Sequence, residues 1–206
     1  MNDESVPVSP LPPPLDRPLA HCLEGPRLLL RPYTASDVDS LASLIGENLA
    51  HLEPFMPWVQ SEPLSIDERI SLIDGWNEEA AHGGGIVLGC YLAGELIGST
   101  GLHRRRPDAG SLEIGYWLSS SHTGRGFATE LTLMLIDEAF EHPEIAFVDL
   151  YCEINNDASA AVARRAGFAL LGVESSRSDD ASSLSKPMNH FRLGRESHDA
   201  GWRARF

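Results

Sequence analysis

The 206-residue sequence has no apolar run approaching the ~18 residues that a membrane-spanning helix requires. Its N-terminus also lacks the basic start and the apolar centre of a secretory signal. Only three cysteines occur, and Cys22, Cys90 and Cys152 stand too far apart for a zinc-ligand or redox motif. We therefore expect a cytoplasmic protein that holds no metal ion and keeps its cysteines reduced.

Positive charge is scarce. The sequence has 16 Lys and Arg residues against 30 Asp and Glu residues, a formal net charge of -14. Nucleic acids and anionic membranes attract proteins through accumulated positive charge, so the sequence argues against both partners. The acidic surplus would favour a cationic partner, such as an amine or a basic protein tail, or it would only keep the surface soluble.

The length and composition indicate a single globular domain. A chain of 206 residues with 42% hydrophobic and 22% charged residues is ordinary for such a domain. Residues 1–20 hold six of the 14 prolines, which predicts a disordered, polyproline-like tail before a domain over residues 21–206. The alternatives for this tail are an SH3-type ligand or a strap across the domain.

Hydrophobic periodicity predicts strands and helices along the whole domain, and they alternate in the second half of the chain. The strands are expected at residues 27–32, 85–92, 95–102, 111–118, 146–151, 168–173 and 188–193. The helices are expected at residues 36–49, 66–81, 126–142 and 157–166. This order predicts an α/β (α+β) fold with one mixed, mostly antiparallel sheet of six to seven strands and helices on both faces.

A glycine-containing loop joins the strand that includes Glu113 to the helix near residue 126. Gly124 and Gly126 flank Arg125 at the point where the helix begins. Glycines allow main-chain N–H groups to approach an anion, and the positive end of a helix dipole favours phosphate. The same pattern also describes a tight turn in which the glycines only supply positive φ.

A second pattern follows about thirty residues later, where Asn156-Asp-Ala-Ser159 opens a helix and Gly167-Phe168 ends it. With the strand Glu113-Ile-Gly-Tyr-Trp-Leu118 and the glycine loop, the chain resembles the GNAT acetyltransferase superfamily, and specifically its RimJ/RimL-like branch. Arg27-Leu-Leu-Leu-Arg31 and residues 47–58 are similar to the opening of that branch. The resemblance spans about residues 25–195 and implies the GNAT fold.

The resemblance implies an enzyme that transfers the acetyl group of acetyl-CoA directly to a primary amine. The acceptor implied by the branch is the N-terminal α-amine of a protein, of the ribosomal-protein type. Two alternatives are an acetyltransferase for a small-molecule amine or antibiotic, and a non-catalytic module that binds acyl-CoA. A homodimer is expected by analogy.

One departure from the branch concerns the acetyl-CoA loop, where Ser121 replaces the usual Gln or Arg. This change weakens one contact with the diphosphate, and Arg125 is expected to supply the cation, unless it is only a solvated residue at the helix start. The run Arg104–Arg106 fits a solvated turn better than a second phosphate site. The residues expected to bind the cofactor are Leu118, Ser119, Thr123, Gly124, Arg125, Gly126, Phe127, Ala128, Asn156 and Ser159.

Direct transfer needs a neutral amine and a stabilised thiolate. Glu113 is the predicted base, through a water molecule. The alternative role is a surface ion pair to an arginine or a backbone contact, and His103 and His122 are weaker candidates for the base. Many acetyltransferases carry a tyrosine on the second motif's helix, and here that position is Ala163. Ser159 is therefore the expected hydrogen-bond donor to the sulfur, unless it only caps its helix.

A proline-stiffened loop between the first two helices is expected to cover the acceptor. The alternatives are a plug in the core or a dimer contact. Tyr116 and Trp117 alternate on their strand, so that one faces the core and the other can face the cleft. The residues assigned to the acceptor site are His51, Phe55, Met56, Trp58 and Tyr116.

Overall fold

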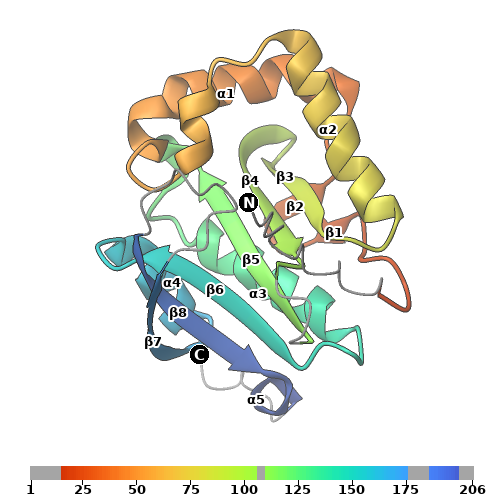
Figure 1. Ribbon diagram of the computed structural model, residues 1–206. Helices are drawn as coiled ribbons and strands as arrows, with labels where there is room; N and C mark the ends of the chain where they lie inside the picture. Colours follow the sequence, from red (N-terminus) through yellow and green to blue (C-terminus); the bar gives the residue numbers. More distant parts are fainter. Residues whose placement is uncertain (1–14, 106–109, 176–185, 200–206) are drawn as a thin grey trace, which may run out of the picture.

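The computed structural model describes residues 15–105, 110–175 and 186–199, which form one sheet with helices on both faces (Figure 1). The strands lie in the order β1-β2-β3-β4-β5-β6-β8-β7. Their bounds are β1 Leu23–Glu24, β2 Leu28–Arg31, β3 Ile86–Leu92, β4 Glu95–His103, β5 Ser111–Leu118, β6 Phe147–Glu153, β7 Ala169–Ser175 and β8 Pro187–Gly194. The helices are α1 Val38–Leu52, α2 Ile66–Ala81, α3 Phe127–Phe140, α4 Asp157–Arg165 and α5 Arg195–Asp199, with 3-10 turns η1 Ala35–Asp37, η2 Pro57–Ser61 and η3 Ser120–His122. Among the described residues, no helix is both long and apolar enough to cross a membrane.

The predicted fold class is confirmed, because the sheet is mixed and all its neighbouring strands pair antiparallel except β5 and β6. The sheet has eight strands, where six to seven were expected. The additional strand is β1, whose two residues pair with Leu29 and Leu30 of β2. A two-residue strand is too short to show the alternation from which strands are predicted.

The packed domain begins earlier in the chain than residue 21. Leu15 and Leu19 are 6% and 1% exposed and belong to the main hydrophobic cluster. Arg17 donates a hydrogen bond to the carbonyl of Glu141, just beyond the end of α3. Residues 15–20 therefore lie against the domain, as a strap would, and are not part of a free tail. Residues 1–14 of the predicted tail lie outside the described residues.

The two parallel strands at the centre of the sheet separate toward their carboxyl ends (Figure 1). Ser111–Ile114 of β5 pair with Phe147–Leu150 of β6, and the pairing goes no further in the described chain. The remaining halves of the two strands diverge. Because both strands run in the same direction, their diverging ends form a wedge at one edge of the paired region, and we call this the β5–β6 wedge.

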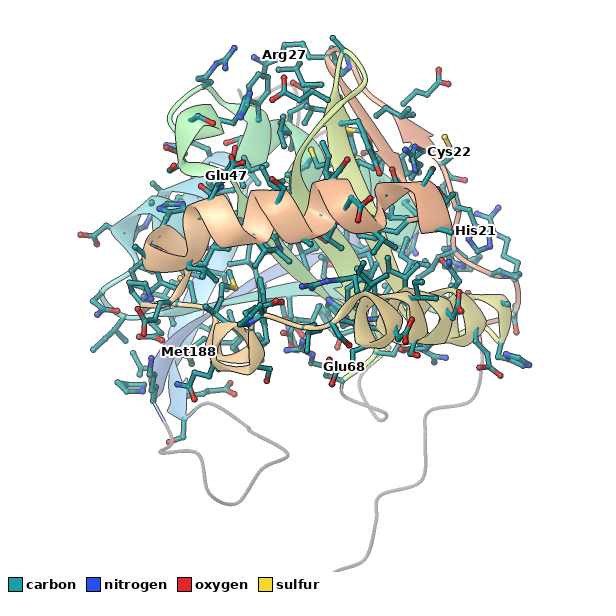
Figure 2. All side chains as sticks on the ribbon, turned by 90° about the horizontal axis from the view of Figure 1, so that it is seen from above. His21, Cys22, Arg27, Glu47, Glu68 and Met188 are labelled. Atoms are coloured by element: carbon teal, nitrogen blue, oxygen red, sulfur yellow. The ribbon has the colours of Figure 1, made fainter. Side chains whose placement is uncertain are left out.

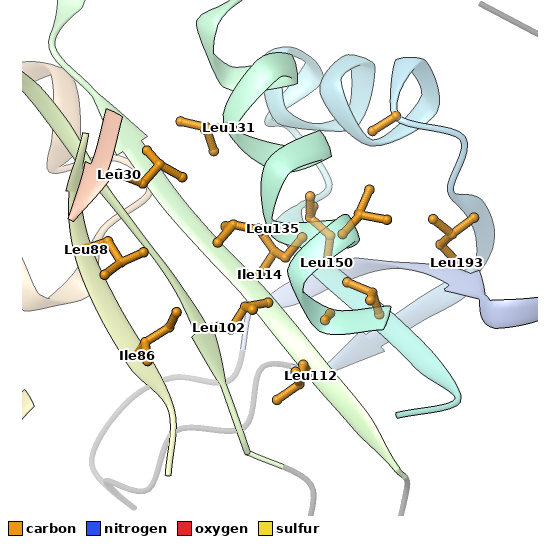
Figure 3. Packing of buried hydrophobic residues seen from close by; sticks show 14 of the residues in the cluster. Leu30, Ile86, Leu88, Leu102, Leu112, Ile114, Leu131, Leu135, Leu150 and Leu193 are labelled. Carbon is orange, nitrogen blue, oxygen red and sulfur yellow. The ribbon is translucent and has the colours of Figure 1, made fainter. Parts of the chain in front are cut away.

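Helices α3 and α4 cover one face of the sheet over the larger hydrophobic cluster. Figure 3 shows Leu131 and Leu135 of α3 packed over Leu30, Leu102 and Ile114 of the strands. All five side chains are at most 2% exposed. Burial of a leucine or isoleucine side chain contributes about 1.5–3 kcal/mol, so this layer fixes the start of α3 firmly against the sheet.

Helices α1 and α2 lie across the opposite face (Figure 2). Their apolar sides pack with Tyr33, Tyr91 and Trp117 in a second cluster. Helix α2 has the bounds predicted for it and starts at a capping box, in which Ser65 Oγ accepts from Glu68 N–H and the Glu68 carboxylate accepts from Ser65 N–H. The sheet therefore separates an α3–α4 face from an α1–α2 face.

Candidate active site

The chain turns sharply between β5 and α3, through η3 and two glycines. Gly124 and Gly126 have φ of 70° and 81°, in the left-handed region that favours glycine. Gly126 is the N-cap residue of α3, and no side chain in the described part of the chain caps that end. The main-chain N–H groups of the first helical turn are thus available to an anion, which the helix dipole also favours.

The space outside this turn is open. A Cβ atom at Gly124 would meet no heavy atom of the described chain within 4 Å, and one at Gly126 would meet only Arg27 Nη2, at 3.5 Å. Glycine is required here by the backbone conformation, and the turn leaves room for a ligand on its outer side. Six of the predicted cofactor-binding residues lie on this turn: Thr123, Gly124, Arg125, Gly126, Phe127 and Ala128.

Two guanidinium groups lie at the turn. The Cζ atoms of Arg125 and Arg27 are 4.9 and 4.4 Å from the centroid of the Phe127 ring. Arg125 is exposed, so its charge can reach a diphosphate bound at the first turn of α3. Arg27 was not predicted as a site residue, because its contact with Arg125 joins positions 98 residues apart in the sequence.

The loop before the glycines is held by its own hydrogen bonds. The Nδ1 atom of His122 lies 2.8 Å from Ser119 Oγ and 3.1 Å from Ser121 Oγ. Ser119 N–H donates to the carbonyl of Ile97 at 2.8 Å, and its own carbonyl accepts from His122 N–H at 2.9 Å. Both main-chain polar groups of Ser119, one of the expected cofactor-binding residues, thus have partners inside the protein. Leu118, the last residue of β5, is buried at 6% exposure.

In the β5–β6 wedge, a strand and a helix are joined by two hydroxyl groups. Tyr116 Oη on β5 lies 3.0 Å from Ser159 Oγ in the first turn of α4. Burial raises the pKa of Tyr116 to about 12, so the phenol stays neutral near pH 7. Asn156 caps α4 by accepting from Ser159 N–H at 3.0 Å. Because Asn156 is the cap, the Ser159 hydroxyl is not needed for that role.

Tyr116 lies on the opposite face of the sheet from the loop that was predicted to cover the acceptor. Its bond to Ser159 places it on the α3–α4 face, whereas Trp117, the next residue, packs in the α1–α2 cluster. The alternation of side chains along β5 accounts for this difference. Ala163, at the position of the missing tyrosine, is fully buried on α4 one turn after Ser159.

The α1–α2 face carries the loop predicted to cover the acceptor. Trp58 in η2 is 37% exposed, and its ring lies 6.1 Å from that of Trp117. Met56 packs at the edge of the same cluster, whereas His51 is exposed and Phe55 half-buried. The loop therefore places aromatic surface directly over the end of β5.

One ion pair and one hydrogen bond from a lysine hold this loop in place. Arg69 and Glu62 form a bidentate pair of 2.6 and 2.9 Å whose side chains are only 3% and 5% exposed. Lys186, just before β8, donates to Glu153 Oε1 at 2.5 Å and to the carbonyl of Pro54 at 3.4 Å. Through these two bonds Lys186 links Pro54 of the loop to Glu153 at the end of β6, across the mouth of the wedge.

Glu113, the predicted base, lies in the paired half of β5. Its neighbours across the sheet are His103 on β4 and Asp149 on β6. Arg105 Nη1 lies 3.0 Å from Glu113 Oε1, which is the ion pair considered as the alternative role. Together with Ser111, these residues line a shallow hollow. Arg106, of the same arginine run, lies outside the described residues, and Arg104 donates to the carbonyl of Gly83.

His103 lies closer to the wedge than Glu113 does. Its Nε2 atom is 3.2 Å from the point that a Cβ atom of Gly115 would occupy, so the ring covers β5 between Glu113 and Trp117. Burial, with a smaller effect of Arg105, lowers the pKa of His103 to about 4. The ring is neutral near pH 7 but is a weak base.

A buried ionic cluster beside Glu113 was not predicted from the sequence. Asp149 accepts two hydrogen bonds from Arg192, at 2.7 and 2.8 Å, and lies 2.9 Å from His190 Nε2. The other ring nitrogen of His190 is 2.7 Å from Glu174 Oε1. Burial of Asp149 favours its neutral form, but the hydrogen bonds from Arg192 and His190 outweigh this and lower the pKa of Asp149. The cluster ties β6, β8 and β7 together.

Comparison with known proteins identifies the family. A family model described as an acetyltransferase (GNAT) domain matches residues 27–169. The Ribosomal-protein-serine acetyltransferase of Escherichia coli (strain K12) is 30% identical over 145 residues, which cover 70% of this chain and 80% of that protein. The Putative ribosomal N-acetyltransferase YdaF of Bacillus subtilis (strain 168) is 29% identical over 147 residues, 71% of this chain and 80% of that protein.

Solved structures share the fold. RimL, a ribosomal L7/L12 alpha-N-protein acetyltransferase in complex with coenzyme A, gives a TM-score of 0.74 at 24% identity and covers 84% of this chain and 97% of its own. Mycobacterium smegmatis RimJ, in complex with CoA-disulfide, gives 0.71 at 25% identity and covers 85% and 87%. The predicted enzyme class, an acetyltransferase, is confirmed, and the chain belongs to the GNAT acetyltransferase family.

Proposed function

We propose that this protein transfers the acetyl group of acetyl-CoA directly to the N-terminal α-amine of a protein. The observation that carries the proposal is the uncapped start of α3, with glycines at φ of 70° and 81°, beside a wedge that holds the Ser159 hydroxyl. The names of the curated relatives, which include a ribosomal-protein-serine acetyltransferase, support the acceptor class.

The residues at the start of α3 fit a nucleotide diphosphate. Main-chain N–H groups of the first turn and the helix dipole stabilise negative charge there. The open space outside Gly124 leaves room for the phosphates, and Arg125 adds a positive charge beside them. The pantetheine arm would follow the β5–β6 wedge and bring the thioester to Ser159.

At the reaction centre, Ser159 stabilises the sulfur of the departing thiolate. A serine hydroxyl is too weak an acid to give up its proton fully, so it acts as a hydrogen-bond donor. Tyr116, whose neutral phenol is 3.0 Å away, donates in turn to Ser159 Oγ and orients its proton. The two hydroxyls thereby replace the tyrosine that is absent at Ala163.

The weakness of the available bases favours an α-amine over a lysine. Deprotonating an α-amine with a pKa near 7.7 costs about 1 kcal/mol at pH 7, and a lysine near 10.4 costs about 4.6 kcal/mol. Glu113 is paired with Arg105, and the pKa of His103 is about 4. In our proposal Glu113 accepts the proton through water, which suffices for an amine that is already partly neutral.

Charge on the acceptor side also suits a cationic substrate. Residues 33–82, which include α1, η2 and α2, contain ten Asp and Glu residues and a single basic residue of the Lys or Arg type. That residue, Arg69, is buried in its pair with Glu62. A positively charged amine would therefore be attracted to this layer and to the aromatic loop around Trp58.

The test is acetyl-CoA turnover with matched peptide acceptors. One peptide has a free N-terminal serine and arginines in place of its lysines; the other has an acetylated N-terminus and one free lysine. Spermidine represents small amines. We expect coenzyme A release and a single acetyl group on the α-amine of the first peptide. Turnover on the lysine or on spermidine alone would contradict the acceptor class, and cofactor binding without turnover on any amine would contradict the enzyme activity.

A further inference from the structure

Arg27 connects three parts of the chain at the start of α3. Its Nη1 atom donates to the carbonyl of Arg125 at 3.1 Å, and its Nε atom lies 2.6 Å from Glu130 Oε2. The guanidinium also lies 4.4 Å from the centroid of the Phe127 ring. Arg27 thus contacts the glycine turn, the first aromatic residue of α3 and a carboxylate in its first turn.

The carboxylate of Glu130 binds the main chain of Arg27 as well as the side chain of Arg27. The Oε1 atom of Glu130 accepts from the N–H groups of Arg27 at 2.8 Å and of Leu28 at 3.2 Å. The Glu130 side chain is only 10% exposed, whereas that of Arg27 is 47% exposed. The start of β2 is therefore fastened to α3 through one buried carboxylate, and the Arg27 guanidinium has a fixed position.

The contact with the Arg125 carbonyl determines which way the next N–H group points. In a trans peptide the C=O bond of residue 125 and the N–H bond of Gly126 lie in one plane and point in opposite directions. Because Arg27 binds the carbonyl, the Gly126 N–H points away from Arg27, toward the open outer side of the turn. This is the side on which the proposed function places the diphosphate.

We infer that Arg27 is a positioning residue for cofactor binding: it orients the Arg125–Gly126 peptide so that its N–H group faces the diphosphate. Arg27 also neutralises Glu130, a carboxylate in the same helical turn that would otherwise repel phosphate. The inference rests on the proposed function and adds to it a residue from the other end of the sequence.

The experiment uses three acetyl donors with the Arg27→Met variant of the full chain. Acetyl-CoA has both the diphosphate and the 3′-phosphate, acetyl-dephospho-CoA lacks the 3′-phosphate, and S-acetylpantetheine lacks both. The matched control is Arg17→Met, since Arg17 also bridges the start of the chain to α3 but at the opposite end, beside Glu141. Turnover is measured with the best amine acceptor, and the Kd of coenzyme A is measured by calorimetry.

For Arg27→Met we expect KM for acetyl-CoA and for acetyl-dephospho-CoA to rise about 10- to 100-fold, as for loss of a charged hydrogen bond. The Kd of coenzyme A should rise by the same factor, while kcat and all kinetics with S-acetylpantetheine stay at wild-type values. Arg17→Met should match wild type with every donor.

Three results would overturn the inference. Unchanged KM and Kd would show that Arg27 does not act on the cofactor, and an equal loss with S-acetylpantetheine would reduce its role to general structure. A loss confined to acetyl-CoA would make Arg27 a direct ligand of the 3′-phosphate. If wild type itself bound no coenzyme A, the proposed function would fail, and the inference with it.

Arg27→Lys provides a second variant if Arg27→Met does not fold. A lysine keeps the charge beside Glu130 but ends in one compact ammonium. It lacks the planar fork through which Arg27 binds Glu130 with Nε and the Arg125 carbonyl with Nη1. We expect this variant to melt near the wild-type temperature and still to bind coenzyme A about 10-fold more weakly. Wild-type affinity in a folded Arg27→Lys variant would contradict the positioning role.

Discussion

Tyr116 Oη and Ser159 Oγ lie 3.0 Å apart and join β5 to α4 across the opening between β5 and β6. This hydrogen bond is made where the two parallel strands have ceased to pair. It places two hydroxyl groups at the position where the proposed mechanism puts the departing sulfur. The chemistry of this family member is therefore expected to depend on a strand residue and a helix residue acting together.

Replacement of Ser159 by alanine should lower kcat about 10- to 100-fold, because one hydrogen bond to a charged sulfur is lost. The Kd of coenzyme A should change little, since the N–H of residue 159 still donates to Asn156 and the cap remains. Steady-state kinetics and calorimetry measure the two effects separately.

Two further variants show whether the hydroxyl pair is responsible. Tyr116→Phe should give a smaller loss of kcat, and between pH 6 and 9 the loss should be constant, because burial raises the pKa of Tyr116 to about 12. Ser71→Ala, on an exposed part of α2, should have no effect on kcat. A wild-type kcat for Ser159→Ala at saturating substrate would remove Ser159 from the mechanism.

A side chain at Gly126 should interfere with the turn that precedes α3. At φ of 81° an L-residue costs about 1–2 kcal/mol, and the bulk of valine would also obstruct the outer side of the turn. We expect Gly126→Val to weaken coenzyme A binding at least about 100-fold in a protein that still folds. Calorimetry combined with thermal melting measures both properties.

Gly46 is the matched control for this change. It lies inside α1, where an added Cβ atom would meet no heavy atom of the described chain within 4 Å. Gly46→Ala should stabilise the protein by about 0.5–1 kcal/mol and leave coenzyme A binding unchanged. Full affinity in a folded Gly126→Val variant would be incompatible with a phosphate site at this turn.

Trp58 should contribute to binding of the acceptor and not of the cofactor. Its ring contacts Trp117 at the end of β5 on the α1–α2 face. For Trp58→Ala we expect KM for the peptide acceptor to rise about 10-fold, through loss of aromatic contact area, while the Kd of coenzyme A is unchanged. Leu72, which is equally exposed at 37% on α2, gives the control Leu72→Ala; identical kinetics for both variants would count against the predicted acceptor site.

Asp37 should make stability depend on pH in the acid range. Its carboxylate forms a bidentate pair with Arg31, at 2.8 Å for both bonds. The hydrogen bonds from Arg31 lower the pKa of Asp37 well below its ordinary value. The pKa of Asp37 is lower in the folded than in the unfolded protein. The Asp37–Arg31 pair therefore contributes fully to the free energy of unfolding above about pH 5, and this contribution is lost as pH falls through the folded-state pKa.

The variant Asp37→Asn should therefore lose about 1.5–3 kcal/mol of unfolding free energy at pH 7. The difference from wild type should shrink steadily below pH 4. Urea unfolding between pH 2.5 and 7 measures it, and a difference that stays constant over this range would rule out the ionic origin.

The sequence predicted those parts of the fold that have strong local signals. Helix α2 was placed correctly because its hydrophobic periodicity is a local feature, and the structure adds the capping box at its start. The turn at Gly124 and Gly126 was assigned to the cofactor because its glycine pattern occurs together with a second family motif about thirty residues later. Ser159 was predicted as a site residue through its place in a family motif, and the structure adds its hydroxyl partner, Tyr116.

Other features depend on contacts between residues that are distant in the sequence. Tyr116 was assigned to the acceptor side because alternation shows only that Tyr116 and Trp117 face opposite sides of the sheet. It does not show which of the two faces α4. Strand β1 has two residues and no pattern of its own. Leu15 and Leu19 were placed in a tail because the neighbouring prolines were conspicuous, yet both leucines are buried. The pairs of Arg27 with Glu130 and of Asp149 with His190 form only when the chain has folded.

The central claim is that main-chain N–H groups at the start of α3 bind the diphosphate of acetyl-CoA. A crystal structure of the protein with coenzyme A tests it most directly. We predict diphosphate oxygens within about 2.7–3.2 Å of main-chain nitrogens of residues 124–128. A diphosphate bound anywhere else on the protein would contradict the account.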